Sequence, residues 1–466
     1  PLYSSAASDV YKRQGPTSGS YTKVKIGASK SGKITAVDAY MVFEAGAFPG
    51  SPVGGAARCM FSPYYIPNAH IEGLDVVVNT QKTAAYRGPG APIGAFAVEQ
   101  ILDEISRKLE IDPMELRVNN ASKEGDRSIA GPLFGQIGSA NVFEAAMNHP
   151  HYSAAKGNGY RGRGVAAGFW GNGGGPASAV AFVNADCTVS FGEGAPDIGG
   201  TRTVVAMQFA EVLGIPVEDI APSVGDTESI GFTSMTGGSG VAYKTGWACY
   251  LAAEDVKRQM IERAASIWDV DASDIEYDDG AITHKSDTEL KTTFKDLAAR
   301  LNATGGPIVG RGTTAERRAG AAGGLHIVDV EVDKETGKVD VLRYTSVQDV
   351  GKAIHPSYVE GQLQGGAVQG IGWALNEEYV IAEDGRMDNA TFLDYRMPVS
   401  LDLPMIDTVL VEVANPGHPF GLRGVGEACL IPPMAAVANA IYDAVGVRLN
   451  DLPMSPVRVS KALENH

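Results

Sequence analysis

Clustered glycine is the feature of this sequence that most restricts its possible folds. The 466 residues include 57 glycines, and many fall in short runs without the every-third-residue spacing of collagen. Glycine tolerates positive φ and lets another backbone or a ligand approach where a side chain would not fit. We therefore expect a globular fold with many loops that pass close to backbone or to a large ligand. The densest runs are residues 171–175, 237–240, 320–324 and 365–372.

One glycine run ends at an acidic residue in front of a predicted helix. Glu427 follows Gly424 and Gly426, and Pro432 then opens a stretch with apolar residues at helical spacing, which Gly446 ends. Local pattern alone favours a structural role, in which Glu427 interacts with the first amides of the helix. The alternative is that the glycines bring the carboxylate close to a ligand.

Composition limits the class of protein. The net charge is −16 and no basic run stands out, which argues against a nucleic-acid or anionic membrane surface. No stretch approaches the roughly 18 uninterrupted apolar residues that a membrane span needs. The four cysteines are far apart and form no CxxC pair, which argues against an iron–sulfur cluster, a structural zinc site or a disulfide framework in this chain. We therefore expect a cytoplasmic protein that binds neither nucleic acid nor membrane.

Two kinds of hydrophobic periodicity predict an α+β fold. Alternation predicts hairpins over residues 21–44, 177–191 and 327–349, and a mostly apolar run predicts a buried strand over residues 71–78. Helical spacing follows several of the glycine-rich loops. The sequence therefore predicts mixed sheets, hairpins and glycine-rich loops that lead into helices.

Composition also suggests how the chain is divided. Residues 1–14 lack both an initial Met and the apolar core of a signal peptide, so we interpret them as a non-native leader and the remainder as a fragment without its N-terminus. A polar stretch with little periodicity places a domain boundary near residue 150. We expect one domain over residues 15–150 and a second over residues 151–466.

A predicted helix over residues 355–375 contains four glycines between residues 365 and 372. Each glycine inside a helix costs roughly 1 kcal/mol relative to alanine, so their number needs a reason. Close packing against a cofactor is one explanation, because the amides of Gln362 and Gln364 can hydrogen-bond a buried heterocycle. Close packing against another helix explains the glycines equally well.

Three further loops lead into helices. Arg87 stands at the head of AYRGPG, residues 85–90, where a guanidinium beside exposed amides suits bidentate binding of a phosphate; the alternative is an ordinary surface arginine. DIGGTRT (197–203) and TGGSG (236–240) also precede helix N-termini, which favour anions. Taken together these loops predict a ligand with phosphate or pyrophosphate, although each loop alone is equally consistent with a simple turn.

Five segments occur in one order along the chain: AYRGPG, DIGGTRT, TGGSG, VEGQLQGGAVQGIG and GVGEA. In this order, from about Tyr21 to Leu463, they resemble the molybdenum-binding large subunit of the xanthine oxidase and aldehyde oxidoreductase family. The resemblance implies a two-domain molybdopterin-binding fold that holds molybdenum–molybdopterin, with its cytosine dinucleotide form as one possible form. It also implies a hetero-oligomer in which partner subunits carry [2Fe–2S] clusters and FAD.

The resemblance assigns roles to individual residues. It implies that Glu427 is the active-site base facing the molybdenum, that Gly426 lets this base approach the metal, and that no side chain of this chain ligates the metal. The other implied cofactor contacts are Arg87 and Gly88 in the loop that passes the metal centre, Ile198, Gly199 and Gly200 in a backbone turn on the molybdopterin, Gly238 and Ser239 in the pterin phosphate loop, and the Gln362 amide.

Departures from the family pattern bear on the substrate. Copper-containing CO dehydrogenases of this family carry a cysteine in the loop after the arginine, where this chain has Gly88, so we do not expect oxidation of CO. Xanthine-oxidising members place a phenylalanine two residues after the arginine to stack on the purine, and this chain has Pro89 at that substrate position. Aldehydes and N-heteroaromatics, which both offer an electrophilic C–H, remain as the expected substrates.

The resemblance implies a hydroxylase that takes its oxygen from water and passes electrons to iron–sulfur and flavin partners, and the fragment alone is expected to be inactive. One alternative is a non-catalytic molybdopterin-binding or assembly subunit, since the loops around Gly200 and Gly240 depart from the family form. Another alternative is a nucleotide-binding protein that reads phosphates through the Gly88 loop.

Overall fold

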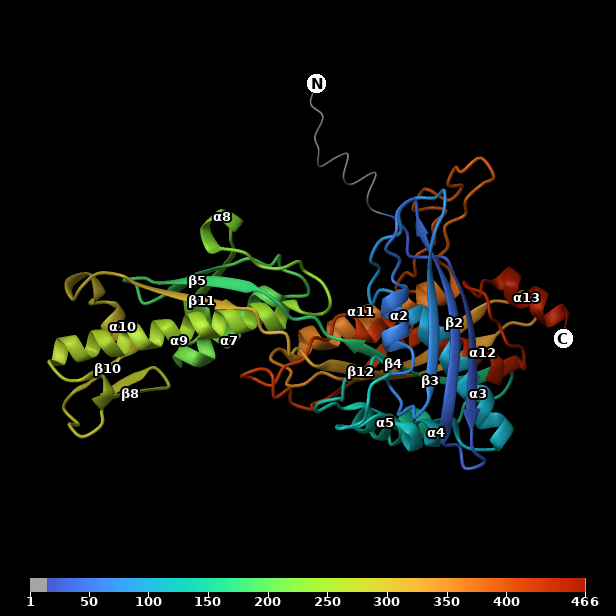
Figure 1. Ribbon diagram of the computed structural model, residues 1–466, viewed down its shortest axis with the longest axis horizontal. Helices are drawn as coiled ribbons and strands as arrows, with labels where there is room; N and C mark the ends of the chain where they lie inside the picture. Colours follow the sequence, from blue (N-terminus) through green and yellow to red (C-terminus); the bar gives the residue numbers. More distant parts are fainter. Residues whose placement is uncertain (1–14, 466) are drawn as a thin grey trace, which may run out of the picture.

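The computed structural model describes residues 15–465, which form an elongated molecule with two lobes (Figure 1). The larger lobe combines both ends of the chain, and the smaller lobe is formed by the middle of the chain, from β5 to β11. The predicted leader, residues 1–14, lies outside the described residues. The predicted domain boundary near residue 150 stays a prediction.

A four-stranded mixed sheet in the order β14–β13–β12–β4 is the centre of the larger lobe. β12 is antiparallel to both β13 and β4, and β13 is parallel to β14. Ile327 lies opposite Thr345, which confirms the hairpin predicted over residues 327–349. The strands are β4 (Arg161–Gly171), β12 (Ala321–Val332), β13 (Val339–Asp349) and β14 (Ile406–Val411).

Both faces of this sheet are buried. Because successive side chains of a strand point to opposite faces, Leu325 and Ile327 of β12 join the core beside α5, whereas Val328 and Val330 join the core beside α11 and α12. Helices therefore cover the sheet on both sides, and the mixed α+β architecture is the predicted one. These helices are α5 (Ser139–Met147), α11 (Pro356–Leu375) and α12 (Pro433–Val445).

Glycines in β4 let α12 lie directly on the strand. A Cβ atom at Gly162 would lie 2.1 Å from the carbonyl oxygen of Ala440, and one at Gly164 would lie 2.0 Å from that of Ala436. Real Cβ atoms do not come so close, so only glycine fits these two positions. The contact fixes the helix that begins just after Glu427.

A three-stranded sheet with the order β1–β2–β3 covers part of the larger lobe. β1 and β2 form the hairpin predicted over residues 21–44, with Lys25 opposite Asp38. The prediction of a buried strand over residues 71–78 is wrong, because β3 lies at the edge of this sheet and most of its residues face solvent. The strands are β1 (Ser20–Ala28), β2 (Ile34–Gly46) and β3 (Ala69–Val77).

The smaller lobe has its own sheet and its own core. The sheet order is β11–β5–β6–β7, and the antiparallel pair β5 and β6 is the hairpin predicted over residues 177–191. Helices α7 and α9 pack on this sheet around Phe191 and Phe209, whose rings stack 5.4 Å apart. The elements are β5 (Ala177–Val183), β6 (Val189–Glu193), α7 (Thr201–Leu213), β7 (Ile220–Val224), α9 (Val241–Trp268) and β11 (Ile308–Thr314).

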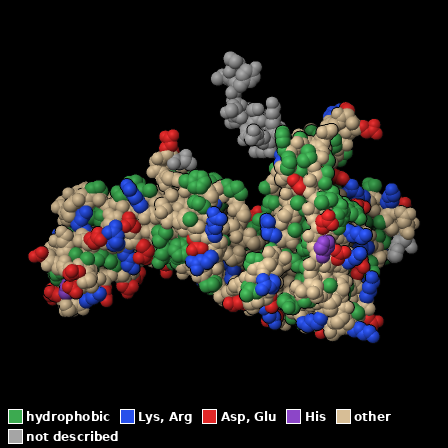
Figure 2. Space-filling model, viewed as in Figure 1, with side chains coloured by type: hydrophobic (Ala, Val, Ile, Leu, Met, Phe, Trp, Pro, Cys, Tyr) green, Lys and Arg blue, Asp and Glu red, His purple; other side chains and the backbone are tan. Residues whose placement is uncertain are grey.

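Shorter elements complete the fold. A small sheet in the smaller lobe has the order β10–β9–β8, and on the face shown in Figure 2 acidic and basic side chains are interspersed on both lobes. The remaining elements are α2 (Val53–Cys59), α3 (Ala91–Leu109), α4 (Pro113–Asn120), α6 (Pro150–Ser153), α8 (Thr227–Ile230), β8 (Ile275–Asp278), β9 (Ala281–His284), β10 (Lys291–Thr293), α10 (Phe294–Ala298) and α13 (Pro456–Glu464).

One segment, Ala428–Val445, is long and apolar enough to cross a membrane by length and composition alone, with a mean hydropathy of 1.4 over 18 residues. It includes α12, and 78% of it is buried inside the protein. The core helix of a soluble protein passes the same test, so this segment is weak evidence for a membrane span. Its apolar character is explained by its packing on β4.

Gly164→Ala is expected to destabilise the protein because its new Cβ atom must displace the backbone of α12. Overpacking of this kind costs about 1–3 kcal/mol, which a urea-denaturation midpoint detects. Gly171→Ala in the same strand is the matched control, since no atom lies within 4 Å of a Cβ atom at that position. Equal midpoints for the two variants would show that β4 and α12 are not in direct backbone contact.

Candidate functional site

The segment around Glu427 has the predicted local structure. The one-turn helix η4 (Ala428–Leu430) and then α12 follow Glu427, and Gly446 ends α12 in the left-handed conformation with φ of 77°. The Glu427 side chain does not cap η4. The structural interpretation, in which the carboxylate binds the first amides of its own helix, is therefore wrong.

The Glu427 carboxylate instead binds two segments that are distant in sequence. The backbone N–H of Gly88 donates to Oε1 at 3.1 Å, and the hydroxyl of Ser239 donates to Oε2 at 3.0 Å. The backbone N–H of Glu427 donates in turn to Ser239 Oγ, also at 3.0 Å. Three of the predicted loops therefore meet at one carboxylate.

The environment of Glu427 favours its neutral form more than water does. Burial raises the pKa of the carboxyl group, while the Gly88 amide, the Ser239 hydroxyl and the charge of Arg87 oppose this shift. The net result is a pKa above the ordinary carboxyl range. Such a shift brings a carboxylate closer to the proton affinity that a general base needs near neutral pH.

Ser239 is held in an uncommon backbone conformation. Gly238 and Ser239 both have positive φ, 64° and 56°, which is unfavourable for a serine. A Cβ atom at Gly424 would lie 1.8 Å from the Ser239 carbonyl oxygen, so the TGGSG loop rests directly on the GVGEA segment. Gly426 is less crowded, since its Cβ atom would lie 3.7 Å from both Gln362 Oε1 and Ser239 Oγ.

Arg87 is a cross-link between α11 and the Glu427 segment. Its guanidinium donates to the backbone oxygen of Gln362 at 3.0 Å, to Gln362 Oε1 at 3.3 Å and to Gln369 Oε1 at 3.4 Å. It also donates to the carbonyl oxygen of Gly426 and to Cys429 Sγ. These acceptors are protein atoms, so the interpretation as an ordinary surface arginine is wrong, and the role of Arg87 toward a phosphate stays a prediction.

The DIGGTRT loop lies against the N-terminal half of α11. A Cβ atom at Gly199 would lie 2.5 Å from Gln362 Nε2, and one at Gly200 would lie 2.4 Å from the ring of Tyr358. The side chain of Ile198 is exposed. The predicted turn therefore meets Gln362 through its glycines, which joins it to the Arg87 cross-link.

Two of the glycines in α11 serve helix packing. A Cβ atom at Gly366 would lie 2.2 Å from Cys429 Sγ, and one at Gly370 would lie 2.6 Å from the ring of Pro433. Gln364 donates to the carbonyl oxygen of Ile406 at 3.4 Å and is used in the fold. Of the two explanations for these glycines, contact with another segment of the chain is the one that the structure supports.

The remaining residues around Glu427 and Arg87 are Pro89, Gln369 and Trp170. The sequence did not indicate the last two. The carbonyl of Pro89 packs on α2, where a Cβ atom at Gly55 would lie 2.2 Å from it, and its role toward substrate stays a prediction. Gln369 was missed, although its spacing of seven residues from Gln362 places both amides on one face of α11. Trp170 at the end of β4 was missed because no local pattern marks it.

The site has unused polar groups that suit an anionic ligand. Helices α3 and α9 begin at Gly90 and Gly240, and no side chain caps either of them, whereas at the start of α7 the Asp197 carboxylate accepts from the backbone N–H of Arg202 at 3.1 Å. Among the described residues, the buried Thr236 Oγ1 has no hydrogen-bond partner, whereas the Trp170 side chain faces Glu427 and lowers the pKa of its carboxyl group by hydrogen bonding. The free N-termini of α3 and α9 and the Thr236 hydroxyl fit a ligand with phosphate and polar ring atoms.

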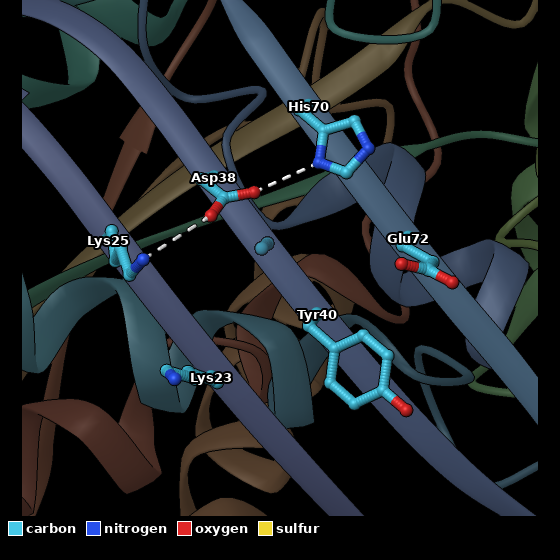
Figure 3. A pocket seen from close by; sticks show the side chains of 7 residues that line it. Lys23, Lys25, Asp38, Tyr40, His70 and Glu72 are labelled. Atoms are coloured by element: carbon cyan, nitrogen blue, oxygen red, sulfur yellow. Dashed lines mark hydrogen bonds and ion pairs between the residues drawn. The ribbon is translucent and has the colours of Figure 1, made fainter.

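A hollow lies on the outer face of the β1–β2–β3 sheet (Figure 3). His70 Nδ1 lies 2.9 Å from Asp38 Oδ1, and Lys25 Nζ lies 3.9 Å from Asp38 Oδ2. The hydrogen bond from His70 lowers the pKa of Asp38, but solvent-exposed ion pairs of this kind contribute little to the stability of the fold. None of the predicted site residues lines this hollow, so we place the functional site at Glu427.

Comparison with known proteins gives consistent matches. A model described as the molybdopterin cofactor-binding domain matches residues 143–404, and a second model of that description matches residues 8–121. The xanthine dehydrogenase molybdenum-binding subunit of Escherichia coli O157:H7 is 35% identical over 404 residues, which cover 82% of this chain and 53% of that protein. The aldehyde oxidoreductase molybdenum-binding subunit PaoC of Escherichia coli strain K12 is 29% identical over 443 residues, which cover 93% and 59%.

A solved structure shows the same fold. The aldehyde oxidoreductase from Desulfovibrio desulfuricans ATCC 27774 superposes with a TM-score of 0.77 at 28% identity, over 96% of this chain and 49% of that one. The chain thus spans about half the length of the relatives that it matches. Because the longer family match alone covers more than half of the sequence, the chain belongs to the molybdopterin cofactor-binding domain family, which includes the molybdenum-binding subunits of xanthine dehydrogenase and aldehyde oxidoreductase.

Proposed function

We propose that this chain forms the cofactor site of a molybdenum hydroxylase and that Glu427 is its general base. The observation that carries the proposal is the position of the carboxylate, which is half-buried and held by Gly88 and Ser239 from two other loops. The proposed substrate is an aldehyde or an N-heteroaromatic compound, and the proposed source of oxygen is water. The glycine at position 88 and the proline at position 89 argue against CO and purines.

The residues of this chain prepare Glu427 for proton transfer. When bound, the molybdenum cofactor supplies the two-electron oxidation of the substrate C–H bond. Glu427 accepts on a carboxylate oxygen the proton that the attacking water must lose, a role typically worth about 10²–10⁴ in rate. Gly88 and Ser239 orient the two oxygens, and Arg87 holds Gly426 so that the acidic segment keeps its position.

Glycine loops and helix N-termini are the proposed contacts of the molybdopterin. Gly238 and Ser239 precede α9, whose first amides no side chain caps. Gly199 and Gly200 precede α7, where Asp197 accepts from the N–H of Arg202 at 3.1 Å, so at this turn the backbone of the two glycines is the proposed contact. Ile198 belongs to the same turn. The residues fit an anionic pterin, and we propose its cytosine dinucleotide form.

The nucleotide form has a direct test. Acid treatment of the purified full-length protein is expected to release cytidine monophosphate in an amount equal to its molybdenum, as measured by chromatography and elemental analysis. Molybdenum without any released nucleotide would restrict the cofactor to the form without a dinucleotide.

Electrons must leave the site through groups that this chain does not supply. Its four cysteines are unpaired, and within residues 15–465 no three His, Cys, Asp or Glu side chains gather as metal ligands. Relatives are named as molybdenum-binding subunits, which supports an assembly of several chains. We therefore propose a cytoplasmic hetero-oligomer in which an iron–sulfur subunit carries [2Fe–2S] clusters, a flavin subunit carries FAD, and this chain alone is inactive.

Glu427→Gln in the full-length protein with its partners is expected to keep molybdenum bound and to lower kcat for an aldehyde at least about 10²-fold, because the amide cannot accept the proton. Elemental analysis and steady-state kinetics measure the two effects. Glu276→Gln, at an exposed position in β8, is the matched control. Near-normal turnover in Glu427→Gln would refute the base assignment, whereas metal without turnover in the wild type would favour the non-catalytic assembly subunit.

Ser239→Ala is expected to move the acid limb of the pH–rate profile to higher pH. The Ser239 hydroxyl hydrogen-bonds the charged carboxylate and so lowers the pKa of Glu427; its removal raises this pKa, and the base becomes protonated at a higher pH. Profiles of kcat/KM for both proteins measure the shift. An acid limb that stays in place, or moves to lower pH, would contradict this assignment.

A further inference from the structure

We infer that Lys244 is a positioning residue for Glu427: its ammonium group anchors the loop from Ser234 to Gly240 so that Ser239 stays against the Glu427 carboxylate. The inference rests on the proposed function in one respect, since it treats Glu427 as the group whose position matters. Lys244 itself need not touch cofactor or substrate.

Lys244 lies in the first turn of α9 and is almost completely buried. Its ammonium nitrogen donates to the backbone oxygen of Ser234 at 2.8 Å, to Ser234 Oγ at 2.9 Å and to the backbone oxygen of Met235 at 2.5 Å. A lysine has three N–H donors, so all three are used on one short piece of loop. The side chain therefore acts as a clamp between the helix and the loop before it.

The free-energy cost of burying the Lys244 ammonium group indicates a role beyond packing. Burial lowers the pKa of the ammonium group, and within residues 15–465 no carboxylate lies within ion-pair distance of it. An ammonium buried among neutral oxygens costs free energy that an apolar side chain of similar length would avoid. The cost is explained if the loop needs a strong anchor at this point.

Polar and backbone contacts, rather than apolar burial, hold the loop. Phe232 is 70% exposed and Met235 is 82% exposed, so apolar burial does not fix their backbone. Backbone contacts supplement Lys244: the N–H of Ser234 donates to the Pro176 carbonyl at 2.9 Å, and the N–H of Gly173 donates to the Gly238 carbonyl at 2.6 Å. Ser178 also donates to Thr233 Oγ1 at 3.2 Å and to the Phe232 carbonyl at 3.4 Å, just before the loop, and Gly424 packs on the Ser239 carbonyl at its end. Lys244 is the only one of these groups that binds both Ser234 and Met235. The anchored segment ends at the strained Ser239.

Ser239 couples the position of the loop to the position of Glu427. Its hydroxyl bridges the carboxylate and the backbone N–H of Glu427, and Ser239 makes both contacts from a left-handed backbone with φ of 56°. If the loop moves at Ser234, where Lys244 holds it, the hydrogen bonds between Ser239 and Glu427 are the contacts of Glu427 that change. Arg87, rather than Lys244, is the cation whose charge acts on Glu427, so the effect of Lys244 runs through the loop.

Lys244→Met in the full-length protein tests the inference. Difference infrared spectroscopy follows the titration of the Glu427 carboxyl band, with Glu427→Gln as the reference, and needs no turnover. We expect the midpoint to move to higher pH by the same amount as in Ser239→Ala, and the double variant to show no further shift. Hydrogen exchange of the amides in residues 233–240 is expected to accelerate about tenfold or more, as the loss of charge-assisted hydrogen bonds implies.

Lys257→Met, on the same helix, is the matched control and should change neither observable. An unchanged Glu427 midpoint in Lys244→Met overturns the inference, and shifts that add in the double variant do so as well, because they indicate a direct effect of charge. If Lys244→Met does not fold, Lys244→Gln, which keeps an amide donor, replaces it under the same criteria. A wild-type protein without turnover refutes the proposed function, while the infrared and exchange results still decide the role of Lys244.

Discussion

Direct contact between backbones, at positions where only glycine fits, is the constraint on which this structure depends. Gly164 lets α12 rest on β4, and Gly424 lets the GVGEA segment rest on the carbonyl of Ser239. The first contact fixes the helix behind Glu427, and the second fixes the loop in front of it. The acidic residue is therefore positioned from both sides by main chain, which is more rigid than a contact between flexible side chains.

This rigidity holds the half-buried Glu427 carboxylate in one position, as its proposed role as a base requires. Burial raises the pKa of the carboxyl group, whereas one amide and one hydroxyl favour the charged form and lower it. The Arg87 cross-link to α11 and to Gly426 adds a nearby positive charge and holds the segments together. Burial and hydrogen bonding thus have opposite effects on the pKa of Glu427, as expected for the proposed base, which must exchange a proton near neutral pH.

Local pattern predicted what local interactions determine. Alternation gave the hairpin of β12 and β13, and glycine-to-helix transitions marked the loops that meet at Glu427. Local pattern failed where contacts between distant segments determine the structure. The acceptors of Arg87 lie 275 to 342 residues away in sequence, and no local pattern marks Trp170 or Lys244. The exposure of β3 was missed for the same reason, since the position of a strand in a sheet is a tertiary property.

We propose that the molybdenum centre sits at the carboxylate held by Gly88 and Ser239. Anomalous scattering at the molybdenum absorption edge, from crystals of the assembled full-length protein, locates the metal without any assumption about activity. We expect a single strong peak beside the Glu427 carboxylate, between the Gly88 loop and the loop of Ser239. A molybdenum peak elsewhere, for example at the charged outer face of the β1–β2–β3 sheet, would contradict it.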